Sequence, residues 1–131
     1  MPEILLIGEN QTRMDEYALA LAKFGLSVEI CTSVYLARAR LEGPAVSLAV
    51  IDVTSPDGGW GLLCEQLRTA WPETEMISLA PYRDFSHTKL EQMGLWAPEH
   101  LLVHPISSAE LVEAVIRALG GEQDSGALHN A

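Results

Sequence analysis

The chain has 131 residues, 48% hydrophobic and 20% charged, which fits one globular domain and excludes disordered and fibrous classes. Eight Lys and Arg against eighteen Asp and Glu give a formal net charge of −10. That field repels phosphate backbones, so we expect no nucleic-acid binding. Secretory-signal and membrane-spanning patterns are not visible, and Cys31 and Cys64 lack metal-binding spacing. We therefore expect a soluble, cytoplasmic domain that contacts no membrane.

Short apolar runs alternate with helix-periodic segments. In chain order we expect a strand over 3–8, a helix over 11–24, a strand over 27–32, a helix over 33–41, a strand over 46–52, a helix over 61–70, a strand over 75–80, a helix over 84–93, a strand over 100–104 and a helix from 107. Five strand–helix pairs with short connections predict an α/β fold with a parallel sheet covered on both faces. Gly120 and Gly121 are expected to end the last helix. The predicted domain therefore covers 1–120, and 121–131 are expected to form a disordered tail.

Candidate site residues follow the strands, where sites form in such sheets. Glu9 and Asp52 each follow an apolar strand. Together they could hold Mg²⁺, and Asp52 could attack a phosphoryl group; equally, both acids could simply cap turns and face water. His104, which precedes Pro105, could pair with Asp52 in a pH-dependent contact. No base–nucleophile–orienter set is visible, so we expect no enzyme activity.

Four segments together resemble the receiver domain of bacterial two-component response regulators. They are ILLIGEN at 4–10, LAVIDVTSP at 48–56, residues 62–68 and LVHP at 102–105, and the resemblance covers about residues 3–119. It implies a doubly wound, flavodoxin-like sheet in the order 2-1-3-4-5, flanked by five helices. It makes Asp52 the phosphoacceptor and implies that Glu9, Asp52 and the Thr54 carbonyl contact Mg²⁺. It also implies a cis peptide bond between His104 and Pro105.

The chain departs from the receiver pattern at four switch positions. Receivers usually have an acid at Gly8, a Ser or Thr at Ala80, an aromatic residue at Leu101 and a Lys at His104. Losing the acid weakens a cation site, and losing the Lys removes a fixed positive charge from the phosphoryl group. Without the hydroxyl and the aromatic ring, the usual response to phosphorylation is also lost. We expect no certain cofactor and at most weak Mg²⁺ binding.

The favoured hypothesis is an atypical receiver, or pseudo-receiver, that acts as a signalling protein–protein interaction module without the usual phosphorylation switch. One alternative is a single-domain response regulator phosphorylated at Asp52, and another is a flavodoxin-like domain that binds a small molecule or cofactor. The resemblance implies that a histidine kinase or downstream effector contacts the fourth helix, fifth strand and fifth helix. Leu95 and Trp96 are candidate contact residues on that face, although Trp96 could instead plug the core edge. The oligomeric state is left open, with a homodimer as one option.

Overall fold

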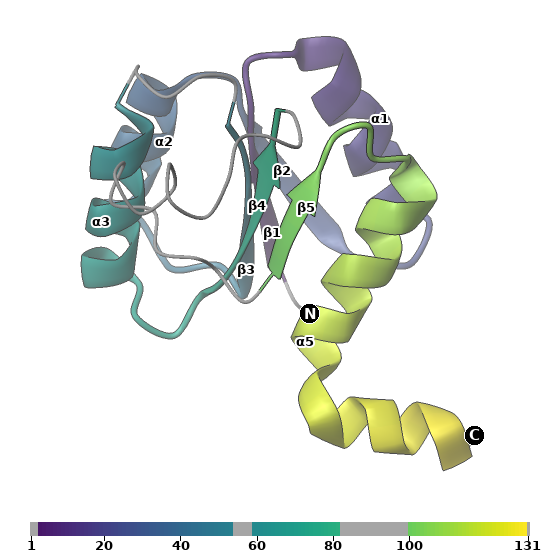
Figure 1. Ribbon diagram of the computed structural model, residues 1–131. Coiled ribbons are helices and arrows are strands. Elements are labelled where there is room, and N and C mark those ends of the chain that lie inside the picture. Colours follow the sequence, from purple (N-terminus) through teal and green to yellow (C-terminus); the bar gives the residue numbers. More distant parts are fainter. Residues whose placement is uncertain (1–2, 54–58, 82–99, 131) are drawn as a thin grey trace.

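A computed structural model of the chain describes residues 3–53, 59–81 and 100–130, with residues 100 and 121–130 described by their backbone alone. Its five strands form one parallel sheet in the order β2-β1-β3-β4-β5 (Figure 1). The strands are β1 (Glu3–Ile7), β2 (Ser27–Cys31), β3 (Leu48–Asp52), β4 (Glu75–Ala80) and β5 (His100–Val103). The predicted fold class and strand order are therefore confirmed.

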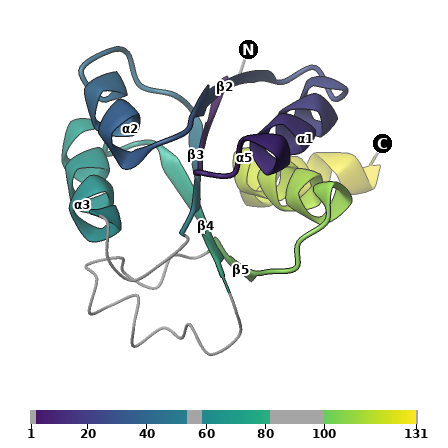
Figure 2. The same cartoon turned by 90° about the horizontal axis from the view of Figure 1, so that it is seen from above.

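Helices cover both faces of this sheet. The described residues include α1 (Gln11–Ala22), α2 (Val34–Arg40), α3 (Trp60–Ala70) and α5 (Ser108–Asn130). Helices α1 and α5 lie on one face, and α2 and α3 lie on the other (Figure 2). The structure thus describes four helices where we expected five, because the helix predicted over 84–93 lies outside the described residues, as do Leu95 and Trp96. None of the described helices is long and apolar enough to cross a membrane.

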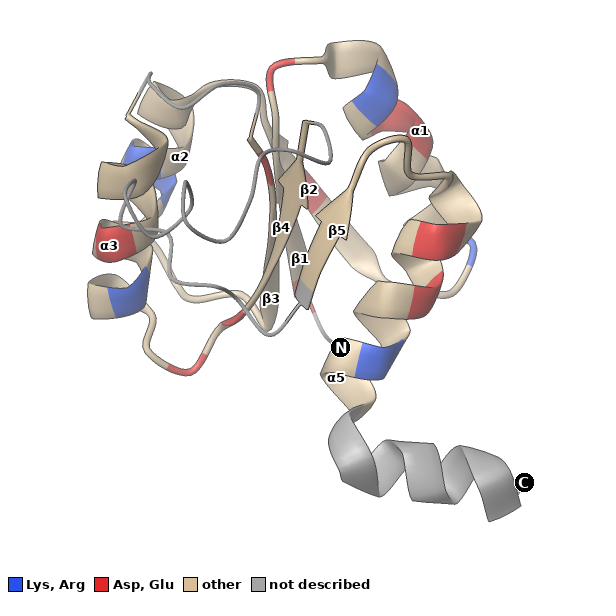
Figure 3. Ribbon diagram, viewed as in Figure 1, with Lys and Arg blue, Asp and Glu red and all other residues tan. Residues whose placement is uncertain are grey.

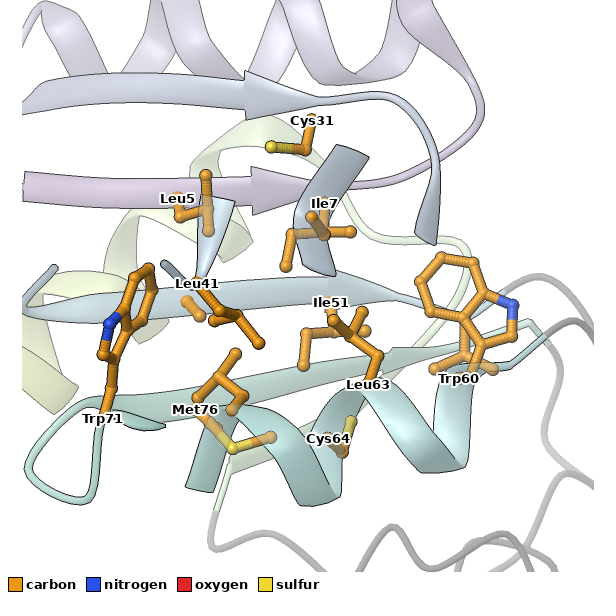
Figure 4. Close-up of a cluster of buried hydrophobic side chains, with 14 of the residues drawn as sticks. Leu5, Ile7, Cys31, Leu41, Ile51, Trp60, Leu63, Cys64, Trp71 and Met76 are labelled. Carbon is orange, nitrogen blue, oxygen red and sulfur yellow. The ribbon is translucent and has the colours of Figure 1, made fainter. Parts of the chain in front are cut away.

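The alternation of side chains along the central strands divides the core into two clusters. In β1, Leu5 and Ile7 face α2 and α3, whereas Ile4 and Leu6 face α1 and α5. Every residue of β3 is buried, as expected for a parallel strand covered on both faces. In the cluster on the α2–α3 side, Trp60 and Trp71 lie at opposite ends of the packed aliphatic side chains (Figure 4).

Capping side chains fix where α1 and α5 begin. The Asn10 side chain accepts a hydrogen bond from the Arg13 backbone N–H at 3.0 Å, which orients the first turn of α1. At α5, Ser107 Oγ accepts from the Glu110 N–H at 3.1 Å, and Glu110 Oε1 accepts from the Ser107 N–H at 2.9 Å. This reciprocal pair is the capping box that the sequence at 107–110 predicts.

The far end of α5 differs from the expectation. The helix continues past Gly120 and Gly121 to Asn130, so the predicted helix end at 120 is wrong. Glycine lowers helix stability by about 1 kcal/mol relative to alanine but keeps its backbone N–H, so it does not by itself end a helix. The disordered tail expected over 121–131 stays a prediction.

Candidate functional site

Among the described residues, three side chains meet at the carboxyl edge of the sheet, and sequence analysis identified only two of them. The Asp52 carboxylate receives a hydrogen bond from His104 Nε2 at Oδ1, over 2.8 Å, and another from Arg13 Nη1 at Oδ2, over 2.9 Å. Because a carboxylate only accepts, Nε2 is the donor in the first contact. Arg13 Nη1 also lies 3.4 Å from His104 Nε2. Both oxygens of Asp52 are therefore already bonded within the chain.

Each of these residues is positioned by the end of a secondary-structure element. Asp52 is the last residue of β3, and His104 directly follows β5, where its backbone N–H donates to the Ala80 carbonyl at 2.9 Å. The bond from His104 to Pro105 is cis, the isomer that the resemblance to receivers implies. Arg13 lies in the first turn of α1, which begins beside the same edge because β1 ends there.

The charge of Asp52 is buried and must therefore be compensated within the protein. The Asp52 side chain is 1% exposed, His104 is 12% exposed and Arg13 is 35% exposed. A carboxylate withdrawn from water costs several kcal/mol unless donors replace its hydration. The charge-assisted bond from Arg13 and the bond from His104 supply that replacement. The guanidinium remains in contact with solvent, so the pair lies at the boundary between core and surface.

Side-chain atoms of Met14 and Asp52 occupy the space beside Gly8. A Cβ atom added there would lie 2.9 Å from both Sδ and Cε of Met14 and 3.0 Å from the Asp52 Cβ. Met14 is fully buried on the same face of α1 that packs against the sheet. Packing therefore fills the position at which receivers usually have an acid, and an acid could enter only if Met14 moved. The other predicted acid, Glu9, is exposed.

These residues do not fit a divalent cation as they stand. Each Asp52 oxygen already accepts one hydrogen bond, one of them from the positively charged guanidinium of Arg13, and that charge opposes a second cation at the same carboxylate. Across the described ranges, no group of three His, Cys, Asp or Glu side chains could hold a metal ion. Thr54, whose carbonyl was a predicted ligand, lies outside the described residues.

Tyr17 connects α1 to the chain that follows the cis peptide. Its hydroxyl donates to the Ile106 carbonyl at 2.9 Å. Burial raises the pKa of Tyr17 to about 12, and the nearby negative charge of Asp52 adds to the increase. One turn before Tyr17, Arg13 contacts Asp52 and His104. The two side chains attach the same face of α1 to the segment around Pro105.

The remaining switch positions lie in the core. Ala80 ends β4, is paired in register with Val103 and is buried in the cluster on the α2–α3 side. Leu101 is partly buried against the cluster on the α2–α3 side. Ser78, two residues before Ala80, is fully buried, and its Oγ has no hydrogen-bond partner among the described residues. A hydroxyl is thus present on β4, but not at the strand end.

Sequence analysis missed Arg13, although its position carries a signal. The helix macrodipole disfavours a positive charge in the first turn of a helix, and the first turn of α1 contains no acidic residue. An arginine there is more favourable when an acid outside the helix pairs with it. Asp52 is that acid, since α1 begins where β3 ends.

No protein-family model matches the sequence, and neither does any curated protein. Solved structures do resemble it. A CheY-like response regulator receiver domain protein from Methanospirillum hungatei JF-1 is 22% identical, with a TM-score of 0.79 over 96% of this chain and 98% of its own. A response regulator from Thermotoga maritima is 20% identical, with a TM-score of 0.77 over 92% and 99%.

A third similar structure is a Burkholderia pseudomallei response regulator that contains a phosphorylated aspartic acid, a calcium ion and citrate. It is 18% identical, with a TM-score of 0.73 over 99% of this chain and 72% of its own. Identities of 18–22% establish a shared architecture. The chain has the fold of response regulator receiver domains.

Proposed function

We propose that the chain is an atypical receiver, a signalling module that acts through protein–protein contacts and does not use phosphorylation of Asp52 as its switch. The observation that carries this proposal is that Asp52 accepts two side-chain hydrogen bonds, from Arg13 at 2.9 Å and from His104 at 2.8 Å. Phosphoryl transfer needs a free carboxylate oxygen as nucleophile and a cation beside the phosphoryl oxygens. In this site both carboxylate oxygens already accept hydrogen bonds.

The neighbouring positions support the same function. A hydroxyl that would bind the phosphoryl group is replaced by the methyl of Ala80, and Leu101 has no aromatic ring that could change rotamer. The chain has the receiver fold and the aspartate, but the residues around Asp52 bond its carboxylate and do not prepare it for phosphoryl transfer. We propose no enzymatic activity and no resident cofactor, with Mg²⁺ binding weak at most.

The proposed partner is another signalling protein, a kinase or an effector, which contacts the face that includes β5 and α5. The described part of α5 presents Glu110 and Glu113 to solvent, with Glu113 paired to Arg117 of the same helix, and acids also lie on α1 (Figure 3). With a formal net charge of −10, such a face favours a basic partner surface. Leu95 and Trp96 remain candidate contacts on this face.

A chemical test separates this function from that of a phosphorylated regulator. The protein is incubated with acetyl phosphate and Mg²⁺, and its intact mass is measured beside an Asp52→Asn control. We expect the mass of the wild type to stay unchanged, as in the control. A gain of one phosphoryl group that the control lacks would show that Asp52 is a working phosphoacceptor, and it would overturn the proposal.

The second candidate function is a single-domain response regulator phosphorylated at Asp52. One observation favours it: Asp52 ends the central strand β3 at the carboxyl edge, in a fold shared with a structure that contains a phosphorylated aspartic acid. In that case Arg13 must leave Asp52 first. The freed oxygen then attacks the phosphorus of acetyl phosphate, and acetate leaves.

A further inference from the structure

Arg13 places a positive charge beside the buried carboxylate of Asp52. A buried carboxylate at a strand end needs a positive counter-charge, which in a metal-dependent site would come from a divalent ion. Here Arg13 Nη1 lies 2.9 Å from Asp52 Oδ2. A metal ion bound to Asp52 would lie close to this guanidinium, so the two positive charges would compete for the same carboxylate.

The position of the Arg13 guanidinium strengthens this competition with a metal ion. Arg13 Nη1 lies 3.4 Å from His104 Nε2 as well, so the guanidinium lies close to both Asp52 and His104. A second cation brought to Asp52 would meet the positive charge of Arg13 at short range. The hydrogen bond that the Arg13 backbone N–H donates to the Asn10 side chain fixes the turn from which the Arg13 side chain extends.

We propose that Arg13 is the resident cation of this site and closes Asp52 to divalent metal ions. It is a positioning residue, since it acts by holding Asp52. The inference rests on the proposed function, because it explains why Asp52 would not accept phosphate. It also makes a separate statement: when the charge at position 13 is removed, the metal affinity at Asp52 rises.

The test compares four proteins, the wild type, Arg13→Gln, Arg13→Lys and Arg117→Gln, by titration with Mn²⁺ alone. Free Mn²⁺ is followed by its paramagnetic resonance signal, and far-UV circular dichroism checks that each variant is folded. Arg117 is a matched surface control, since its side chain is 64% exposed and pairs with Glu113 of the same helix. Arg13→Lys keeps the positive charge while changing the shape of the side chain.

We expect Arg13→Gln to bind Mn²⁺ about tenfold or more tightly than the wild type. Arg13→Lys and Arg117→Gln should stay as weak as the wild type, and adding Asp52→Asn to Arg13→Gln should abolish the gain. The inference is overturned if Arg13→Gln gains no affinity, if Arg13→Lys gains as much, or if the gain survives Asp52→Asn. Since no phosphodonor is present, the inference can fail here while the proposed function passes its own mass measurement.

Discussion

Replacing Arg13 by glutamine should destabilise the domain measurably, because it leaves a buried carboxylate with one donor fewer. Removing one partner of a fully buried ion pair costs about 3–5 kcal/mol, whereas exposed pairs are worth about 0–1 kcal/mol. Asp52 is 1% exposed but Arg13 is 35% exposed, so water can enter and partly replace the guanidinium. We therefore expect a loss of about 1–3 kcal/mol in the free energy of unfolding.

A double-mutant cycle with Asp52→Asn isolates the pair. Without the carboxylate, Arg13→Gln should cost less than about 0.5 kcal/mol. Urea unfolding followed by tryptophan fluorescence measures each variant, since Trp60 and Trp71 are 2% and 4% exposed and should report loss of the core. Equal costs of Arg13→Gln with and without the Asp52 carboxylate would refute the interpretation of Arg13 as its stabilising partner.

Three further predictions follow from packing and burial. Gly8→Asp should cost about 1–3 kcal/mol in urea unfolding, because its Cβ would lie 3.0 Å from the Asp52 Cβ and would displace the end of the buried Met14 side chain. It should not create Mg²⁺ affinity by itself, and an unchanged unfolding midpoint would contradict this packing argument. Tyr17→Phe should cost about 1–3 kcal/mol, since the carbonyl that its hydroxyl bonds is left without that donor, and the same fluorescence assay checks it. Burial raises the pKa of the Cys64 thiol to about 12 from an ordinary value of 9.0. The contribution of this thiol to the free energy of unfolding should therefore fall as pH rises from about 9 towards 12, because the unfolded state loses the proton first. A thiol reagent at pH 8 should label Cys64 in urea and not in the native protein, and fast native labelling would show that the thiol is accessible.

The sheet could be predicted because its signals are local. Apolar runs such as those of β1 and β3 predict strands buried on both faces, and the capping box at Ser107 predicts where α5 begins. The end of α5 could not be predicted as well, since the tendency of Gly120 to end a helix is weak. Even the pair Gly120 and Gly121 does not decide where this helix ends, because glycine only lowers helix stability.

The sequence indicated two of the three side chains of the candidate site. Asp52 and His104 were predicted to approach each other because both follow strands of one sheet. Arg13 is 39 positions from Asp52, and its role depends on the direction in which its side chain leaves α1. Charged side chains in the first turn of a helix that follows a strand can reach the same edge, so they belong among the candidates in folds of this kind.

The most direct test of the central claim is a crystal structure grown with Mg²⁺ and soaked with acetyl phosphate. It shows at once which groups hold the Asp52 oxygens under conditions that favour phosphorylation. We expect an unmodified Asp52 with Arg13 and His104 at hydrogen-bond distance, as in the contacts of 2.9 and 2.8 Å described above. A phosphorylated Asp52, or a metal ion in the place of the guanidinium, would contradict the account.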